Sequence, residues 1–177
     1  MNVWHDVAFG DKAPNEVNLI VEIPTGSQNK YEIDKDTGLI KLDRVLYSPF
    51  HYPGDYGFIP RTLGQDGDPL DGIVLVNFPT YPLTLMAVRP LGVLRMVDGG
   101  DNDEKILCVP VDDVRHKDTN SLADVPEAIR NEIAHFFETY KQLEGKKVEI
   151  NGWGDLEEAK TIIKEGIVRY QEKFPSA

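Results

Sequence analysis

The sequence of 177 residues has almost no cysteine, no long apolar run and far fewer basic than acidic residues. Its single cysteine, Cys108, excludes an intrachain disulfide, and its apolar neighbours favour a small buried side chain over a nucleophile. No apolar run approaches the roughly 18 residues of a membrane span. The first residues carry neither the basic start nor the apolar core of a secretory signal. We therefore expect a protein of a reducing compartment, with no membrane partner.

The shortage of basic residues narrows the possible partners. Nineteen Lys and Arg residues face thirty Asp and Glu residues, which gives a formal net charge of −11. Nucleic acid and anionic lipid bind cationic surfaces, so this charge argues against both. An anionic substrate stays possible, because bound metal ions can reverse the local charge. Acid spread over the surface would indicate solubility, whereas acid concentrated in loops would indicate metal.

Several common catalytic motifs are also missing. The sequence contains no phosphate-binding P-loop, no dinucleotide-binding fingerprint and no nucleophile elbow. Its four histidines show no zinc spacing. The remaining candidates for chemistry are therefore carboxylates, lysines, arginines and tyrosines.

Length and the lack of a linker predict a single domain over residues 1–177. The first two-thirds contain short β-rich runs separated by turn residues, a pattern typical of a small barrel or sandwich. One segment, 48–60, holds three prolines and two glycines and is expected to be a loop. The predicted strands are 17–23, 30–33, 39–45, 73–77, 84–88, 92–97 and 105–111.

The last third predicts two amphipathic helices. The first is expected to begin at a cap formed by Asp124, with Glu127 three residues further on, and to end at Gly145. Residues 146–150 have the composition of one more strand. The second helix is expected to begin at Asp155, which starts the same cap pattern. Strands followed by helices predict an α+β fold.

Two acidic clusters lie in predicted loops. In the first, Asp66, Asp68 and Asp71 fall within six residues, where they repel one another and favour a hard cation such as Mg²⁺. An EF-hand calcium loop does not fit, because Leu70 stands at a ligand position. The second cluster, 98–105, is by itself compatible with a flexible turn, and a solvated acidic turn is the alternative for the first. If a barrel brings both to one rim, they form a site for several metals.

Charged residues also alternate along the early strands. Lys30 and Glu32 share a strand face, Glu22 ends the preceding strand, and Arg44 lies on the following one. A solvent-exposed face is the ordinary interpretation. The functional interpretation is that the cations bind phosphate, which suits both the planar fork of arginine and the compact charge of lysine.

Together these segments resemble soluble family I inorganic pyrophosphatase of the compact prokaryotic type. The segment Asp66-Gly-Asp-Pro-Leu-Asp-Gly72 matches the aspartate signature of that family. Residues 52–60 match the segment that precedes this signature in the family. The likeness continues in the same order through 21–24, 30–32, the strand of Arg44, 98–105 and 134–141. It implies a small five-stranded OB-like barrel flanked by two C-terminal helices, with the site at the mouth of the barrel.

The resemblance further implies Mg²⁺-dependent hydrolysis of inorganic pyrophosphate to two orthophosphates, by in-line attack of a metal-activated water. It implies three to four Mg²⁺ ions per active site, with Asp68 as the general base and Tyr56 beside the nucleophile. The implied metal residues are Asp66, Asp71, Asp98, Asp103, Glu22 and Glu32. The implied substrate-binding residues are Lys30, Arg44, Lys105, Tyr140, Lys141 and Tyr52.

The same resemblance implies a cytoplasmic homohexamer. Acids outnumber bases among the implied site residues and pyrophosphate is itself an anion, so we expect substrate binding to require metal. Asp101 is assigned to the turn of the second acidic cluster. From the residues alone, another class of function stays open, namely an acidic OB-like module that binds Ca²⁺ for structure and hydrolyses nothing. Nucleic-acid binding by the barrel has less support, because the sequence lacks an aromatic and basic groove.

Overall fold

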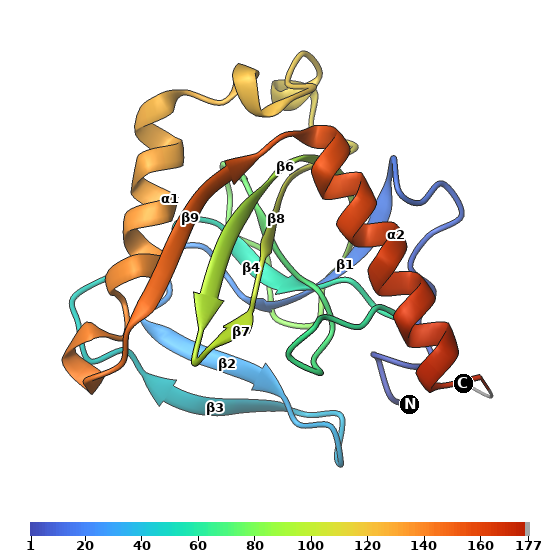
Figure 1. Ribbon diagram of the computed structural model, residues 1–177, viewed down its shortest axis with the longest axis horizontal. Helices are drawn as coiled ribbons and strands as arrows, with labels where there is room; N and C mark the ends of the chain where they lie inside the picture. Colours follow the sequence, from blue (N-terminus) through green and yellow to red (C-terminus); the bar gives the residue numbers. More distant parts are fainter. Residues whose placement is uncertain (176–177) are drawn as a thin grey trace.

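A closed ring of five strands forms the centre of the computed structural model, which describes residues 1–175 (Figure 1). The strands follow one another in the order β1-β4-β5-β8-β6, and the ring closes because β1 also pairs with β6. All of these pairs are antiparallel except β5 with β8. The predicted α+β fold with an OB-like barrel is thus confirmed. The ring strands are β1 Val17–Ile23, β4 Asp55–Phe58, β5 Asp71–Val74, β6 Leu85–Asp98 and β8 Lys105–Pro110.

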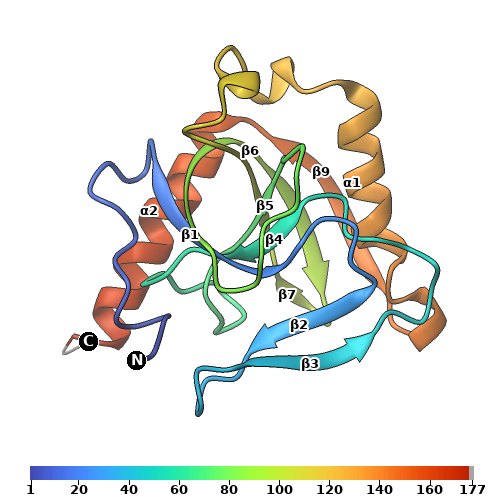
Figure 2. The same cartoon turned by 180° about the vertical axis from the view of Figure 1, so that it is seen from behind.

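A hairpin, two further strands and two helices surround the barrel. The hairpin β2–β3 is a separate two-stranded sheet, seen below the barrel in Figure 1. The helices α1 and α2 flank the barrel on opposite sides, as both views show (Figures 1 and 2). These elements are β2 Asn29–Ile33, β3 Ile40–Val45, β7 Asp101–Asn102, α1 Glu127–Thr139, β9 Val148–Gly154 and α2 Leu156–Lys173, with 3₁₀ turns η1 Val114–His116, η2 Leu122–Asp124 and η3 Gln142–Glu144.

One ring strand, β4, lies inside the segment 48–60, so the expectation of a loop there was wrong over four residues. β4 pairs with β1 on one side and β5 on the other. At Gly57 a β-carbon would lie 1.9 Å from the carbonyl oxygen of Ile20, so only glycine lets the two backbones approach this closely. A glycine that is typical of turns serves strand pairing here.

The strands expected at 84–88 and 92–97 form one strand, β6, and the break between them was wrong. The register to β8 shifts between Pro90 and Gly92, so the strand bends there without ending. Proline is tolerated at such a bulge because the ladder is already interrupted. The long strand can therefore pair with β1, β8, β9 and β7.

The expected cap of the first helix was also wrong. Pro126 occupies the N-cap position of α1, and Val125 before it is extended, as residues before proline usually are. Asp124 therefore lies outside the helix and accepts hydrogen bonds from the backbone N–H and the hydroxyl of Ser121. Gly145, with φ +73°, ends η3 and not α1.

Apolar side chains pack the barrel against both helices. One cluster includes Phe136 and Phe137 of α1, and another includes Ala159 and Ile163 of α2. Cys108 is fully buried in the second cluster, and burial raises the pKa of its thiol above the usual range. The prediction of a structural cysteine is thus confirmed. Within residues 1–175, no helix combines the length and the apolar character needed to cross a membrane.

The predicted cap of the second helix is confirmed, because Asp155 Oδ1 accepts a hydrogen bond of 2.9 Å from the backbone N–H of Glu158. Asp155→Ala should lower the free energy of unfolding by about 1 kcal/mol, because this N–H loses its partner. Asp155→Asn keeps an acceptor oxygen and should retain most of the stability. Urea unfolding of both variants measures the difference. Equal losses would show that the charge of Asp155, and not its hydrogen bond, stabilises α2.

Candidate active site

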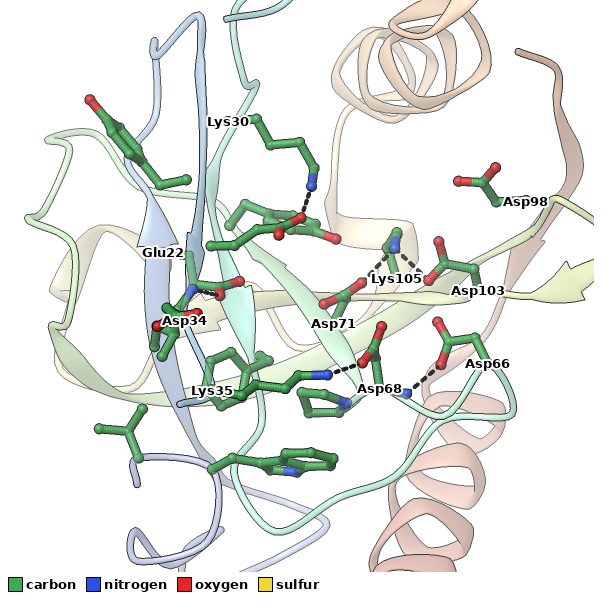
Figure 3. Close-up of a pocket in the computed structure, with 18 of the residues that line it drawn as sticks. Glu22, Lys30, Asp34, Lys35, Asp66, Asp68, Asp71, Asp98, Asp103 and Lys105 are labelled. Atoms are coloured by element: carbon green, nitrogen blue, oxygen red, sulfur yellow. Dashed lines mark hydrogen bonds and ion pairs between the residues drawn. The ribbon is translucent and has the colours of Figure 1, made fainter. Parts of the chain in front are cut away.

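A cavity of about 340 Å³ lies where the barrel, the β2–β3 hairpin and the end of α1 meet (Figure 3). Nine carboxylates and four lysines line it. The acidic side chains are Glu22, Glu32, Asp34, Asp66, Asp68, Asp71, Asp98, Asp101 and Asp103, and the basic ones are Lys30, Lys35, Lys105 and Lys141. Much of the acidic surplus is therefore concentrated at one place, which is the arrangement expected of a metal site and not of a merely soluble surface.

All but two of the fourteen predicted site residues line this cavity. Tyr52 is buried behind the wall, with its ring centroid 5.5 Å from that of Tyr56. Arg44 lies opposite Lys30 in the hairpin, but its guanidinium contacts Asp43 at 2.5 Å and Glu144 at 2.9 Å. Its Nη2 is buried and has no hydrogen-bond partner within residues 1–175. The geometry therefore gathers the predicted residues, with Tyr52 and Arg44 just outside the lining.

The ammonium group of Lys105 lies at the centre of the acidic wall. Lys105 starts β8 directly opposite Asp71, which starts the parallel strand β5. Its Nζ lies 2.6 Å from Asp71 Oδ2 and 2.6 Å from Asp103 Oδ1, and 5.5 Å from the ring centroid of Tyr56. Burial disfavours this charge, but the two carboxylates outweigh burial and raise the pKa of Lys105 above its usual range.

Other contacts join the hairpin and the first helix to the barrel mouth. Glu22 of β1 accepts a hydrogen bond of 2.8 Å from the backbone N–H of Ile33, at the end of β2. Lys141, just after α1, forms an ion pair with Asp98 at the end of β6. In this way, carboxylates from two barrel strands hold the two elements that cover the cavity.

Several of these carboxylates hold their protons more tightly than usual. Burial raises the pKa of Glu22 to about 8 and that of Asp66 to about 6, and in both cases neighbouring carboxylates add to the effect. Burial also raises the pKa of Asp71, although Lys105 opposes this shift. A nearby cation would favour the charged forms, so the set of oxygen donors fits a hard ion such as Mg²⁺.

The lysines affect how such an ion would bind. Within residues 1–175, no three His, Cys, Asp or Glu side chains are grouped closely enough to hold an ion as they stand. Lys105 lies between Asp71 and Asp103, and Lys141 contacts Asp98. Metal binding would therefore require these carboxylates to exchange a lysine contact for the ion.

Sequence reasoning missed several parts of the cavity wall, including Asp34 directly after β2. Trp4 of the N-terminal segment and Lys35 of the hairpin turn both line it. Asp101, expected in a turn, lies in β7 and also faces the cavity. Trp4 gave no signal in the sequence because its place depends on a tertiary contact. Lys35 was visible only as part of a turn, since nothing local indicates where a turn lysine points.

The inorganic pyrophosphatase family model matches residues 19–171 of this chain. The chain belongs to the inorganic pyrophosphatase family. The inorganic pyrophosphatase of Halalkalibacterium halodurans is 52% identical over 158 residues, which cover 89% of this chain and 97% of that relative. The inorganic pyrophosphatase of Geobacillus stearothermophilus is 51% identical over 167 residues, with 94% and 99% covered. The crystal structure of the Thermus thermophilus inorganic pyrophosphatase superposes with a TM-score of 0.94 at 47% identity, covering 97% of this chain and 99% of that one.

The raised pKa of Glu22 gives this pyrophosphatase-family protein a testable pH dependence. Its carboxyl pKa rises from 4.5 to about 8 in the folded protein, so its contribution to stability is complete below pH 4.5 and is lost as the pH rises through 8. In chelator, the wild type should lose on the order of 4 kcal/mol over this window through Glu22. Glu22→Gln keeps an oxygen for the Ile33 N–H and should show a shallower slope.

Urea unfolding at several pH values between 5 and 8.5 measures these slopes. Glu172→Gln changes an exposed carboxylate of α2 in the same way and should keep the wild-type slope. A slope for Glu22→Gln that matches the wild type would show that Glu22 ionises normally in the folded protein.

Proposed function

We propose that this protein hydrolyses inorganic pyrophosphate to two orthophosphates and uses Mg²⁺ to do so. The observation that carries the proposal is the single cavity in which acidic and basic residues from six strands, three loops and the end of α1 meet. Family membership supports the substrate, because the matched relatives are named inorganic pyrophosphatases. An anion with several negative charges suits a site with lysines on its walls and carboxylates that can hold cations.

The acidic residues would hold three to four Mg²⁺ ions. Bound Mg²⁺ would neutralise charge on the phosphates and lower the pKa of the attacking water. The side chains that we assign to this task supply only oxygen donors, which Mg²⁺ prefers. They are Asp66, Asp71, Asp98, Asp103, Glu22 and Glu32.

Asp68 is suited to take the proton from the attacking water. Its side chain is 60% exposed, so it can reach solvent in the cavity, and Lys35 contacts only its Oδ1. Because Oδ2 accepts no hydrogen bond from residues 1–175, it is free to accept a proton. Tyr56 lies half-buried beside Asp71, and desolvation of its hydroxyl and this charge raise its pKa well above the usual range. Tyr56 therefore stays protonated and can donate a hydrogen bond.

The remaining polar residues are placed to bind the phosphoryl oxygens. Each lysine that we assign to substrate binding forms an ion pair with a carboxylate of the cavity, so its ammonium group lies at the acidic wall. Arg44 has a guanidinium nitrogen without a partner among the described residues, which suits a phosphate oxygen reaching the hairpin. Tyr52 supports the ring of Tyr56 from behind. We assign substrate binding to Lys30, Arg44, Lys105, Tyr140, Lys141 and Tyr52.

We further propose that the chain is one domain that assembles as a cytoplasmic homohexamer. Large apolar side chains that are exposed on the isolated chain support subunit contacts. They include Phe78, Tyr81, Leu83, Leu85 and Val114. Light scattering of the purified protein tests the assembly, and a monomer at micromolar concentration would contradict it.

The proposed activity predicts phosphate release from pyrophosphate in the presence of Mg²⁺ and its loss on addition of a chelator. A colorimetric phosphate assay on the purified protein measures both. No release with any of several divalent metals would overturn the proposal. Metal binding without hydrolysis would instead indicate the structural Ca²⁺-binding module.

The site assignment predicts different effects for two aspartates. Asp71→Asn removes the proposed ligand charge beside the buried Lys105 and should lower kcat/KM by about 10²-fold or more. Asp118→Asn is the matched control, because its side chain is 89% exposed and lies outside the cavity. Asp101 is a poorer control, since it faces the cavity. Equal activities of the two variants at saturating Mg²⁺ would refute the role of Asp71.

A further inference from the structure

Asp68 differs from its neighbours in the aspartate loop in what holds its carboxylate. Asp71 contacts Lys105, and Asp66 Oδ1 accepts a hydrogen bond of 3.0 Å from the backbone N–H of Asp68. The carboxylate of Asp68 has a single side-chain partner within residues 1–175, the ammonium group of Lys35. Without that partner, its χ angles would be free to change between rotamers. The orientation of the proposed base therefore depends on one lysine.

Lys35 reaches Asp68 from the opposite wall of the cavity. It lies in the turn between β2 and β3, and Figure 3 shows its side chain extending across the mouth of the cavity toward the aspartate loop. The same view shows the carboxylate of Asp68 pointing inward, toward Asp71. Lys35 thus links the hairpin to the loop that carries the base.

An aromatic ring fixes the far end of Lys35. Its Nζ lies 5.2 Å from the ring centroid of Trp4, a distance typical of a cation–π contact. Trp4 is only 9% exposed, its Nε1–H donates to the carbonyl of Thr62 at 2.9 Å, and its own carbonyl accepts from the backbone N–H of Arg61 at 2.9 Å. Residues 61–62 lead directly into the aspartate loop. The ring is therefore anchored to the same segment that carries Asp68.

Stability does not account for this arrangement. Both side chains of the Lys35–Asp68 pair are more than half exposed, and exposed ion pairs contribute little to folding. A role in orienting Asp68 does account for the arrangement. The ammonium group of Lys35, placed by Trp4, holds Oδ1 of Asp68 in one position and leaves Oδ2 facing the cavity.

We propose that Lys35 is a positioning residue that orients the carboxylate of Asp68 for proton transfer. The proposal rests on the proposed pyrophosphate hydrolysis with Asp68 as its base. Lys35 acts through Asp68 and not on the substrate, so its loss should affect turnover and not substrate affinity. Outer-shell partners of this kind typically change activity 10- to 100-fold.

The test compares Lys35→Gln and Lys35→Arg in wild-type and Asp68→Asn backgrounds, at saturating Mg²⁺. We expect Lys35→Gln to lower kcat about tenfold, with KM within about twofold and an unchanged melting temperature. Lys35→Arg keeps a cation and should restore most of kcat. In the Asp68→Asn background, Lys35→Gln should cause no further loss, because no carboxylate is left to orient. Lys117→Gln removes an exposed lysine outside the cavity and serves as the charge control.

Three results would overturn the positioning role while the wild type remains active. They are an unchanged kcat, a raised KM with unchanged kcat, which would indicate phosphate binding by Lys35, and the same fold-loss in both backgrounds. If the wild type releases no phosphate, the proposed function fails and the positioning role fails with it. The wild-type assay therefore separates the two failures.

Discussion

Repulsion among the carboxylates at the mouth of the barrel is the constraint on which the rest of the structure depends. Acidic side chains crowd one cavity, and the buried ammonium group of Lys105 separates Asp71 from Asp103. Lys141 pairs with Asp98 and balances its charge. Losing one partner of a buried pair leaves an uncompensated charge, which is far more costly than the pair is favourable. The contacts that relieve repulsion therefore also fix β5, β8, β6 and the end of α1 relative to one another.

The strand pairing of the barrel determines which charged side chains lie next to one another in the site. The parallel pair β5–β8 places a carboxylate and a lysine side by side at the start of adjacent strands, which no short-range turn could achieve. The hairpin adds Lys30 and Lys35 from the other side of the cavity. Cations and anions consequently alternate around one space. The proposed anionic substrate would meet lysines there, and the acids would bind metal by exchanging their lysine contacts for the ion.

The elements that depend on local sequence pattern, and the site residues that accompany the aspartate signature, could be predicted from the sequence. The hairpin 30–45 and the cap at Asp155 follow from alternation and capping chemistry, and twelve of the cavity residues follow from the resemblance to family I pyrophosphatases. It did not predict β4, because Gly57 is required by the approach of another strand's backbone. It also misplaced the start of α1, where Pro126 outweighs Asp124. Trp4 was missed because only folding brings the N-terminus beside the loop at 61–62.

The pairings of β6 have a consequence for how the chain acquires its shape. This strand joins β1 near the N-terminus to β9, which ends at Gly154. The β1–β6 pair that closes the ring joins residues 17–20 to residues 85–88, and the β6–β9 pair joins residues 93–98 to residues 148–154. Such non-local pairings form slowly because loop-closure entropy is lost before the contacts form. During synthesis, Asp98 at the acidic rim must remain without its partner Lys141 until the chain has been extended beyond α1. The order of translation therefore delays completion of the site until Lys141 can reach Asp98.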